Sequence, residues 1–408
     1  MTPEIRLKAL PGARDPWHRS AAAMQLKYGT NPHQRYAAVD PVEPGTNPIE
    51  VLNGTPSLIN FLDALNAWQL VRELRACLGL PAATSFKHVS PAGAAIAAPL
   101  GDELRRVYEV EGRELSPAAL AYVRARGADP KSSFGDFVAL SDRVDRETAE
   151  FLKGVVSDGI VAPGYDPAAL EILKGKKSGG FIVMRADPDF EPPPRETREI
   201  FGVRLTQDRN DHVIGRKDLA NVKIGALTED ATRDLLLGLI TLKYTQSNSV
   251  GYAWGGQMIG IGAGQQSRVD CTKLAGAKAD AWQLGRHPKV LGLRFKESVK
   301  RQDRINLRVR YIEGDLTREE AHVLRDALEA PAEPLTEADK AAFLRTIGGV
   351  SLVSDGFIPF RDNVDHARKH GVGFIAEPGG SARDADVEAA CKEYGIALVY
   401  TNLRLFHH

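Results

Sequence analysis

The sequence has few of the features that mark disulfide-rich or membrane proteins. It contains only three cysteines, at positions 77, 271 and 391, which lie far apart and form no Cys-x-x-Cys pair. This excludes a disulfide scaffold, and we expect free thiols in a reducing cytoplasm. No apolar run is long enough to cross a bilayer, so no membrane-spanning helix is expected. The first 23 residues contain prolines and charges but no apolar core, which argues against a signal peptide.

The sequence also lacks an excess of charge of either sign. Lys+Arg and Asp+Glu both number 53, so the formal net charge is zero. This removes the electrostatic reason to expect nucleic acid or an anionic membrane surface as a partner. The 408 residues are 43% hydrophobic, which predicts a globular protein with two domains.

Hydrophobic patterns predict alternating helices and strands in both halves of the chain. An apolar stripe over residues 58–80 predicts a helix, and strands follow at 137–140, 159–162 and 180–183. The second half repeats this alternation, with predicted strands at 249–253, 257–261, 350–353, 372–376 and 396–400. Such alternation indicates a three-layer α/β fold in each half.

Prolines between residues 188 and 194 mark the expected boundary between the halves. We therefore expect an N-terminal extension over residues 1–23, a first subdomain over 24–200 and a second over 201–408. Charged amphipathic helices are predicted at 319–328 and 337–345, the latter capped by Thr336, and they are expected to form scaffold rather than site.

The chain is organised around residues 85–95, SFKHVSPAGAA. Residues 82–89 predict a buried strand, residues 90–93 break it, and a helix is expected to begin over 94–100. In open α/β sheets, ligands bind where a strand leads into a helix, and Lys87 and His88 lie there. An ammonium beside an imidazole keeps the ring neutral and able to act as a base. On the dipeptide alone, a solvated lysine beside a structural histidine explains the pair at least as well.

Five stretches in a fixed order resemble the aminoimidazole carboxamide ribonucleotide (AICAR) formyltransferases. They are residues 26–34 (LKYGTNPHQ), 84–95, 132–142 (SSFGDFVALSD), 243–250 with 260–276, and the tail 354–408. The resemblance implies two cytidine-deaminase-like α/β/α subdomains, with a helical insertion at about 285–345 in the second. The zinc motifs of deaminases, His-x-Glu and Pro-Cys-x-x-Cys, do not occur, so no zinc is expected.

The resemblance implies transfer of a formyl group from 10-formyltetrahydrofolate to the 5-amino group of AICAR. That amine is a weak nucleophile, so the reaction needs a base and stabilisation of an oxyanion. By resemblance, His88 is the general base, Lys87 stabilises the oxyanion, and Asn248 orients the substrate. The remaining implied AICAR contacts are Lys27, Tyr28, Gly135, Asp158, Arg268, Phe357 and Arg404. The implied folate contacts are Val269, Asp362, Ser381 and Ala382.

Ordinary structural roles remain open for several of these residues. Asn248 could form an Asx-turn, Asp158 could form a turn, and Asp362 could cap a helix at 363–370. Many relatives carry arginine at the position of Lys27, and residues 377–380 also depart from the family pattern. The GIGAG run at 260–264 lacks a complete G-x-G-x-x-G pattern, which argues against a dinucleotide site.

The resemblance also implies a homodimer whose active sites are shared between chains, and a bound potassium ion in some members. Only about 25 residues precede the first matching stretch, so the cyclohydrolase domain of bifunctional relatives is expected to be absent, with a separate IMP cyclohydrolase acting downstream. Two alternatives are a nucleotide deaminase or hydrolase on the same fold, and a regulatory protein that binds AICAR without catalysis.

Overall fold

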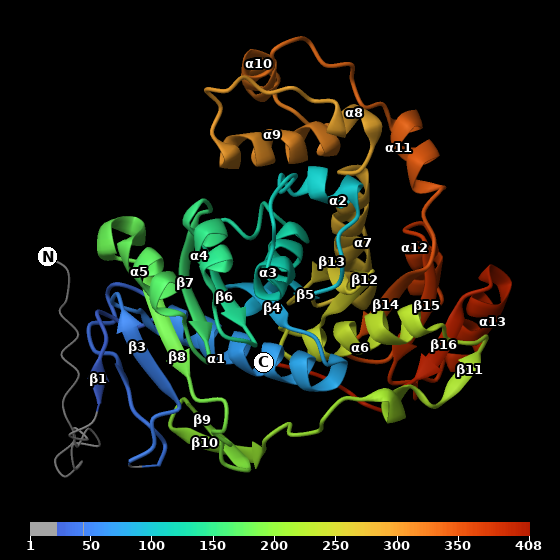
Figure 1. Ribbon diagram of the computed structural model, residues 1–408. Coiled ribbons are helices and arrows are strands. Elements are labelled where there is room, and N and C mark those ends of the chain that lie inside the picture. The colour runs from blue at the N-terminus through green and yellow to red at the C-terminus, as the bar shows by residue number, and fades with distance from the viewer. Residues whose placement is uncertain (1–22, 44) are drawn as a thin grey trace, which may run out of the picture.

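The computed structural model describes residues 23–43 and 45–408, so the expected N-terminal extension lies almost entirely outside the described residues. The fold is α/β and is built on one mixed sheet of 12 strands, in the order β11-β16-β15-β14-β12-β13-β5-β4-β6-β7-β8-β3 (Figure 1). The two halves of the chain meet where β13 pairs with β5, at Gln257 and Ala95. The predicted α/β class is therefore confirmed.

Each half contributes six strands with the same connectivity. The first half contains β3 (Ile49–Asn53), α1 (Leu58–Leu78), β4 (Ala82–Lys87), β5 (Ser90–Ile96), α2 (Asp102–Val107), α3 (Pro117–Gly127), β6 (Asp136–Leu140), α4 (Arg146–Lys153), β7 (Ser157–Ala162), α5 (Pro167–Gly175) and β8 (Ile182–Ala186). The second half contains β11 (Val222–Ile224), α6 (Glu229–Lys243), β12 (Val250–Trp254), β13 (Gln257–Gly262), α7 (Arg268–Leu284), β14 (Val350–Ser354), α12 (Asp362–Arg368), β15 (Val372–Glu377), α13 (Asp384–Tyr394) and β16 (Ala397–Tyr400).

The strand pairings show that the halves are a structural repeat. In the first half the hairpin β4–β5 pairs antiparallel with β6, while β6, β7 and β8 run parallel and β3 closes the edge antiparallel. The hairpin β12–β13 stands in the same relation to β14, β15, β16 and β11. We propose that the subdomains divide near residue 200, because each half then contains one complete copy of this pattern.

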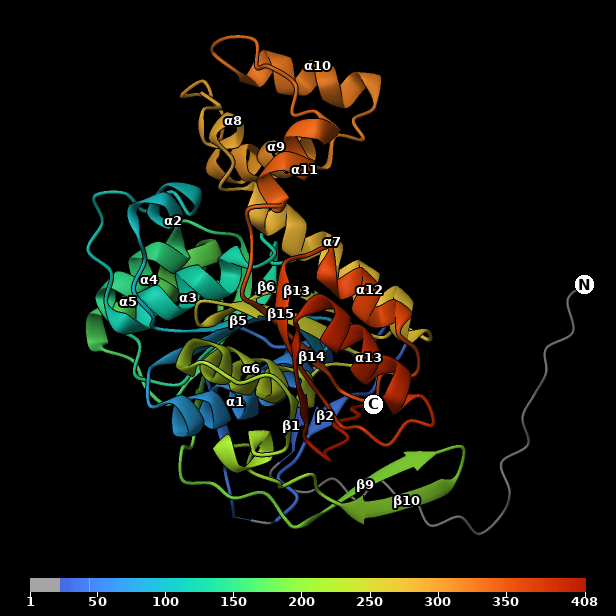
Figure 2. The ribbon, with the colours of Figure 1, turned by 90° about the vertical axis from the view of Figure 1, so that its right-hand side faces the viewer.

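Two hydrophobic cores cover the two faces of the sheet. One core joins the sheet to α1 and α6, and the other joins it to α3, α4, α5, α7, α12 and α13. Figure 2 shows these helices on opposite sides of the strands, so the arrangement has three layers.

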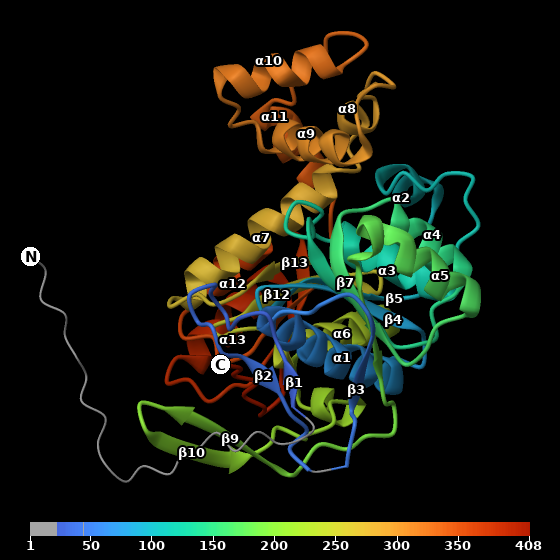
Figure 3. The same ribbon diagram turned by 90° about the vertical axis from the view of Figure 1, so that its left-hand side faces the viewer.

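A separate group of helices follows α7. It consists of α8 (Pro288–Leu291), α9 (Arg301–Glu313), α10 (Arg318–Ala327) and α11 (Glu337–Leu344), which have a small core of their own. The predicted cap is present, because the Thr336 side chain accepts a hydrogen bond from the Asp339 backbone. Figure 3 shows α7 running from beside α12 up to this group.

Two small antiparallel pairs lie outside the large sheet. One is β1 (Met24–Gln25) with β2 (Ala38–Val39), and the other is the exposed hairpin β9 (Arg195–Ile200) with β10 (Val203–Asp208). Cys77, Cys271 and Cys391 are free thiols, as expected. Within residues 23–43 and 45–408, no helix is long and apolar enough to cross a membrane.

The prediction that a helix begins over residues 94–100 is wrong, because β4 turns directly into strand β5. Lys87 pairs with Ser90, and the two residues between them, His88 and Val89, have φ values of 53° and 58°. Two central residues with positive φ are typical of a two-residue hairpin turn. The alanine-rich run favours a helix by propensity, but here it is buried. At Gly93, a Cβ atom would lie only 2.1 Å from the carbonyl oxygen of Ala125 on α3, so the close approach of that helix requires small residues.

Candidate active site

The β4–β5 turn presents Lys87 and His88 at the end of a buried strand. His88 is exposed, and the Lys87 ammonium donates a hydrogen bond to the backbone carbonyl of Phe134. On α1, the buried carboxylate of Asp63 accepts a hydrogen bond from the Val89 backbone N–H at 2.7 Å. Burial raises the pKa of Asp63 to about 6, although the Val89 N–H and the nearby His88 oppose that shift. Asp63 therefore anchors the turn, a role that the sequence did not reveal.

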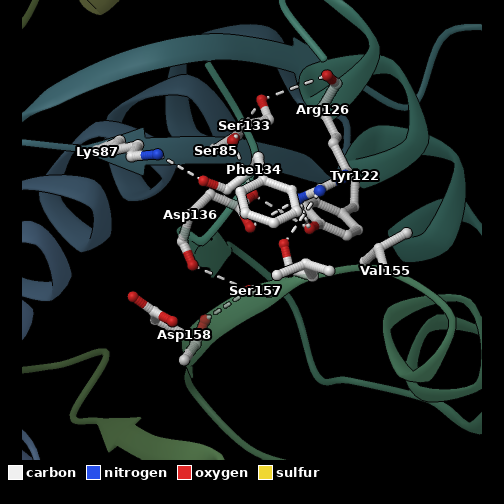
Figure 4. A network of polar contacts seen from close by, with 12 residues as sticks. Ser85, Lys87, Tyr122, Arg126, Ser133, Phe134, Asp136, Val155, Ser157 and Asp158 are labelled. Carbon is white, nitrogen blue, oxygen red and sulfur yellow. Dashed lines mark hydrogen bonds and ion pairs between the residues drawn. The ribbon is translucent and has the colours of Figure 1, made fainter. Parts of the chain in front are cut away.

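A buried polar network supports the loop beside Lys87 (Figure 4). The Asp136 carboxylate accepts hydrogen bonds from the Ser85 hydroxyl at 2.7 Å and the Tyr122 hydroxyl at 3.1 Å. It also pairs with the Arg126 guanidinium at 2.7 Å. The Ser85 hydroxyl also accepts a hydrogen bond from the Ser133 hydroxyl, with the two oxygens 2.8 Å apart. This network fixes the loop that leads to Phe134 and Gly135.

Gly135 lies close to the strand that carries Asp158, because the Gly135 N–H donates to the Val156 carbonyl at 3.0 Å. Gly135 has a φ of 77°, a left-handed conformation that suits glycine. Asp158 lies within strand β7, so its alternative role as a turn residue is wrong. Its carboxylate forms a half-exposed ion pair with Lys177 at 2.6 Å, which leaves the carboxylate accessible from solvent.

The second turn, just before β12, carries Asn248. The Arg268 guanidinium donates to the Asn248 side-chain oxygen at 2.7 Å, and the Asn248 amide donates to the Gln266 carbonyl at 3.3 Å. These partners lie 20 and 18 residues away, so the alternative of a local Asx-turn is wrong. An arginine side chain can only donate hydrogen bonds, so the group of Asn248 that faces Arg268 must be the amide oxygen. The NH₂ group of Asn248 therefore points away from Arg268.

A fully buried carboxylate, Asp355, organises the surroundings of Asn248. It forms an ion pair with Arg268 and accepts hydrogen bonds from the Ser247 hydroxyl at 2.6 Å and the Ser249 backbone at 2.9 Å. The Asp355 carbonyl also accepts from the Leu405 backbone at 2.8 Å. Asp355 therefore ties the C-terminal tail to the Asn248 turn. Apart from its place in the matching tail, nothing in the sequence signals this role.

The tail and the two turns lie together in one chain. The Ser247 N–H donates to the His407 carbonyl at 3.0 Å. Arg404, three residues before His407, is exposed, and its guanidinium lies 4.9 Å from the Phe406 ring centre. The Gln246 N–H donates to the Ser90 hydroxyl at 3.4 Å. This contact joins the turn of Lys87 and His88 to the turn of Asn248.

Glu377 lies at the end of β15 and bonds to two loops. One loop carries Phe357, which is expected to contact the base ring of AICAR, and the other carries Ser381, an expected folate contact. The Oε2 atom of Glu377 accepts from the Ile358 and Gly379 backbones, each at 3.0 Å, beside the half-exposed Phe357 and before Ser381. Its Oε1 is buried and makes no hydrogen bond. Burial raises the pKa of Glu377 to about 7, opposed by the same two N–H groups.

The remaining predicted contacts lie around these loops. Val269 is in the first turn of α7, and Ser381 and Ala382 precede α13. Asp362 does not cap α12, because the helix begins at Asp362 itself and Arg361 occupies the cap position. Its carboxylate instead accepts from the Asn363 amide at 2.9 Å and remains in the first turn, where the helix dipole favours an acid.

Lys27 and Tyr28 follow β1, and the Lys27 ammonium lies 5.9 Å from the Tyr28 ring centre. In the described part of the chain, no hydrogen bond or ion pair joins them to either turn. Nor do the described residues contain a group of three or more His, Cys, Asp or Glu side chains placed to hold a metal ion.

Comparison with known proteins agrees with the motifs. Residues 10–278 match the family model described as AICARFT/IMPCHase bienzyme. The chain is 30% identical to the bifunctional purine biosynthesis protein PurH of Cereibacter sphaeroides (strain ATCC 17029) over 402 residues, which is 97% of this chain and 62% of that protein. It is 31% identical to PurH of Ruegeria sp. (strain TM1040) over 389 residues, or 95% of this chain and 60% of that protein. The chain thus spans about three fifths of the length of these relatives, and it belongs to the AICARFT/IMPCHase family.

Proposed function

We propose that the protein transfers the formyl group of 10-formyltetrahydrofolate to the 5-amino group of AICAR in purine biosynthesis. The observation that carries this proposal is the contact between Ser90 and Gln246. It brings the Lys87–His88 turn beside the turn of Asn248, the residues expected to carry the chemistry. Membership of the AICARFT/IMPCHase family supports the same reaction.

The exposed imidazole of His88 can reach a substrate in solvent, so we assign it as the base that takes a proton from the amine. Lys87 keeps two of its three N–H donors after bonding to Phe134, and these can stabilise the tetrahedral oxyanion. A positioned base typically contributes a rate factor of ~10²–10⁴, and fixed positive charge at an oxyanion contributes a similar factor.

Asn248 acts on the substrate as a hydrogen-bond donor. Its side-chain oxygen is occupied by Arg268, while its NH₂ group retains one free N–H after bonding to Gln266. Arg268 is therefore assigned first to orienting Asn248, which adds to the direct substrate contact expected from the sequence.

The other contacts are proposed by position. Arg404, with Lys27 and Tyr28, holds the ribose phosphate, since a guanidinium can bind two phosphate oxygens. Phe357 lies against the base ring, and Gly135 and Asp158 face the ribose. Val269, Asp362, Ser381 and Ala382 contact the folate. A potassium ion near the Asn248 turn, and a homodimer that shares its sites, complete the proposal.

The test is to incubate the protein with AICAR and 10-formyltetrahydrofolate and to separate the products by chromatography. We expect tetrahydrofolate and formyl-AICAR in equal amounts, with both depending on AICAR. The same run shows whether the reaction stops at formyl-AICAR, as we expect, or continues to IMP. Binding of AICAR without release of tetrahydrofolate would contradict the proposal and favour a regulatory role.

A further inference from the structure

A strained turn follows α5. It is the 3₁₀ helix over Lys176–Gly179, in which Lys177 and Ser178 both have a φ of 52° and a ψ of 39°. This is the left-handed region, which residues other than glycine rarely adopt. Two such residues in succession lower stability and persist only where surrounding contacts hold them, which happens most often at functional sites. The contacts of this turn therefore indicate what it positions.

Contacts on two sides hold the turn in place. The Asn53 side-chain amide, at the end of β3, donates to the carbonyls of Gly179 at 3.0 Å and Phe181 at 2.7 Å. On the other side, the Lys176 ammonium donates to the Val155 carbonyl and lies 5.3 Å from the Phe181 ring centre. The turn is therefore attached both to β3 and to the residues just before β7.

Held in this way, the turn directs Lys177 at Asp158 on β7. The Lys177 ammonium donates to Oδ1 of Asp158 at 2.6 Å, and the two side chains are 39% and 49% exposed. Ion pairs this exposed contribute little to stability, so the contact does not offset the cost of two left-handed residues. We infer that the pair serves a purpose other than stability.

A short series of hydrogen bonds joins Asp158 to the proposed active site. The Lys87 ammonium donates to the Phe134 carbonyl, and the N–H of the next residue, Gly135, donates to the Val156 carbonyl at 3.0 Å. Val156 lies only two residues before Asp158 on the same segment. A substrate bound beside Lys87 is therefore within a short reach of Asp158.

The electrostatics of Asp63 agree with this placement. Burial raises the pKa of Asp63, the Val89 N–H and the charge of His88 oppose that shift, and the charge of Asp158 adds to it. Because the interaction between two charges weakens with distance, both His88 and Asp158 lie near Asp63, the acid beneath the β4–β5 turn.

The Asp158 carboxylate can accept more hydrogen bonds than Lys177 provides. Among the described residues, none donates a hydrogen bond to its Oδ2, and Oδ1 keeps a second lone pair beside Lys177. Neighbouring hydroxyls on a sugar are donors that suit such an acceptor, and hydrogen bonds to an ionised group are the stronger ones. The Lys177 ammonium also offsets the repulsion between this carboxylate and the phosphate of a nucleotide.

We propose that Lys177 is a positioning residue for the sugar of the substrate. Its ammonium holds the Asp158 carboxylate in place to accept from the ribose hydroxyls, so the pair favours a ribonucleotide over a nucleotide without these hydroxyls. The inference rests on the proposed function, in which Asp158 faces the ribose of AICAR, and it adds the residue that determines how strongly this contact is made.

The main test compares the binding of AICAR with the binding of its 2′,3′-dideoxy counterpart, both by calorimetry. The wild-type protein should bind AICAR at least about tenfold more tightly, the factor that one hydrogen bond to a charged group supplies. Lys177→Met removes the ammonium and should lower this ratio at least about threefold, because a free carboxylate loses side-chain entropy on binding. Lys177→Arg keeps the charge and the donors, so it should keep most of the ratio.

Lys174→Met is the matched control. Lys174 lies at the end of α5, its side chain is also 39% exposed, and it pairs with Glu171 instead of Asp158. Both lysines belong to exposed ion pairs, so both variants should fold normally, and Lys174→Met should keep the wild-type ratio. If Lys177 had only a structural or general electrostatic role, Lys177→Met would weaken both nucleotides equally. Equal weakening, an unchanged ratio in Lys177→Met, or a wild-type ratio near one would each overturn the inference.

Kinetics separate the inference from the proposed function. Lys177→Met should raise the KM for AICAR at least about threefold and leave kcat unchanged, because a ribose contact is made equally in the ground state and the transition state. A lower kcat with an unchanged KM would overturn the positioning role. Formyl transfer with a binding ratio independent of Lys177 would overturn the inference and leave the proposed function intact. A ratio that depends on Lys177, without release of tetrahydrofolate, would do the reverse, and absence of AICAR binding would overturn both.

Discussion

The carboxylate of Asp63 accepts a hydrogen bond from the backbone N–H of Val89 at 2.7 Å. Val89 is a β-branched residue with a φ of 58°, a conformation that such residues rarely adopt. A buried acid on α1 thus holds the strained turn that presents Lys87 and His88. We regard Asp63 as a positioning residue for the proposed base.

Replacing Asp63 tests this role. Asp63→Ala leaves the Val89 N–H without a partner, so the free energy of unfolding should fall by about 1–3 kcal/mol. Turnover should fall more than AICAR binding, because the turn would relax. Asp63→Asn retains an oxygen that can accept the same bond, and it should recover most of the turnover. Normal kcat in Asp63→Ala, measured under saturating substrates, would remove Asp63 from this role.

Glu377 should make stability depend on pH. Its pKa in the folded protein is about 7, against an ordinary value of 4.5, so between these values the folded state retains a proton that the unfolded state loses. The free energy of unfolding should therefore fall as pH rises from about 4.5 to 7, by up to roughly 3 kcal/mol from this residue. Urea unfolding at several pH values measures the slope.

The matched variants are Glu377→Gln, which cannot ionise, and Glu393→Gln, which removes an exposed acid. The first should flatten the fall in stability over this range, and the second should leave it unchanged. Equal slopes in wild type and Glu377→Gln would show that Glu377 is ionised throughout.

Arg268 is predicted to serve both stability and catalysis. Arg268→Ala leaves the fully buried Asp355 carboxylate without its ion-pair partner, which typically costs about 3–5 kcal/mol. Arg268→Lys keeps the charge but cannot contact Asp355 and Asn248 together, so it should lose less stability and still lower kcat. Unfolding and kinetic measurements on both variants check this, and full activity in Arg268→Lys would exclude the orienting role.

Much of the fold could be predicted because its strands are apolar and its helices have clear caps or stripes. The helix predicted over residues 94–100 failed because the buried alanine run has no periodicity, and alanine's helix propensity misleads where small residues serve close packing. The β9–β10 hairpin was missed because its strands are exposed and rich in charge. The structural repeat consists of matching strand pairings in the two halves. Which strands pair cannot be read from a short stretch of sequence, so the repeat could not be predicted.

The candidate site was predictable only through its motifs. Lys87, His88 and Asn248 lie in stretches that resemble the family. The acids that hold these residues in place, such as Asp63, Asp136 and Asp355, resemble any solvated aspartate in the sequence. Their roles depend on partners brought together by the fold, often from a distant segment.

Sharing of sites between two chains is a further prediction. The contact between Ser90 and Gln246 lies within one chain, so a site built from a single chain is a concrete alternative. His88→Ala and Arg404→Ala should each be inactive. If His88 and Arg404 of one site come from different chains, random exchange makes about half the dimers mixed, with one intact site each, and activity returns to about a quarter of wild type. No recovery after exchange, confirmed by mass, would place both groups in the same chain.

The most direct measurement is the single-turnover rate of formyl transfer, with AICAR and 10-formyltetrahydrofolate both saturating, in wild type, His88→Ala and Lys87→Ala. In the proposed mechanism, His88 takes up a proton and Lys87 faces the oxyanion, so both act mainly in the transition state. We predict that each substitution lowers the rate by at least ~10² while AICAR binding, followed by calorimetry, remains measurable. A rate near that of wild type in either variant would contradict the assignment of that residue. Near-normal rates in both would show that the turn between β4 and β5 is not the site of formyl transfer.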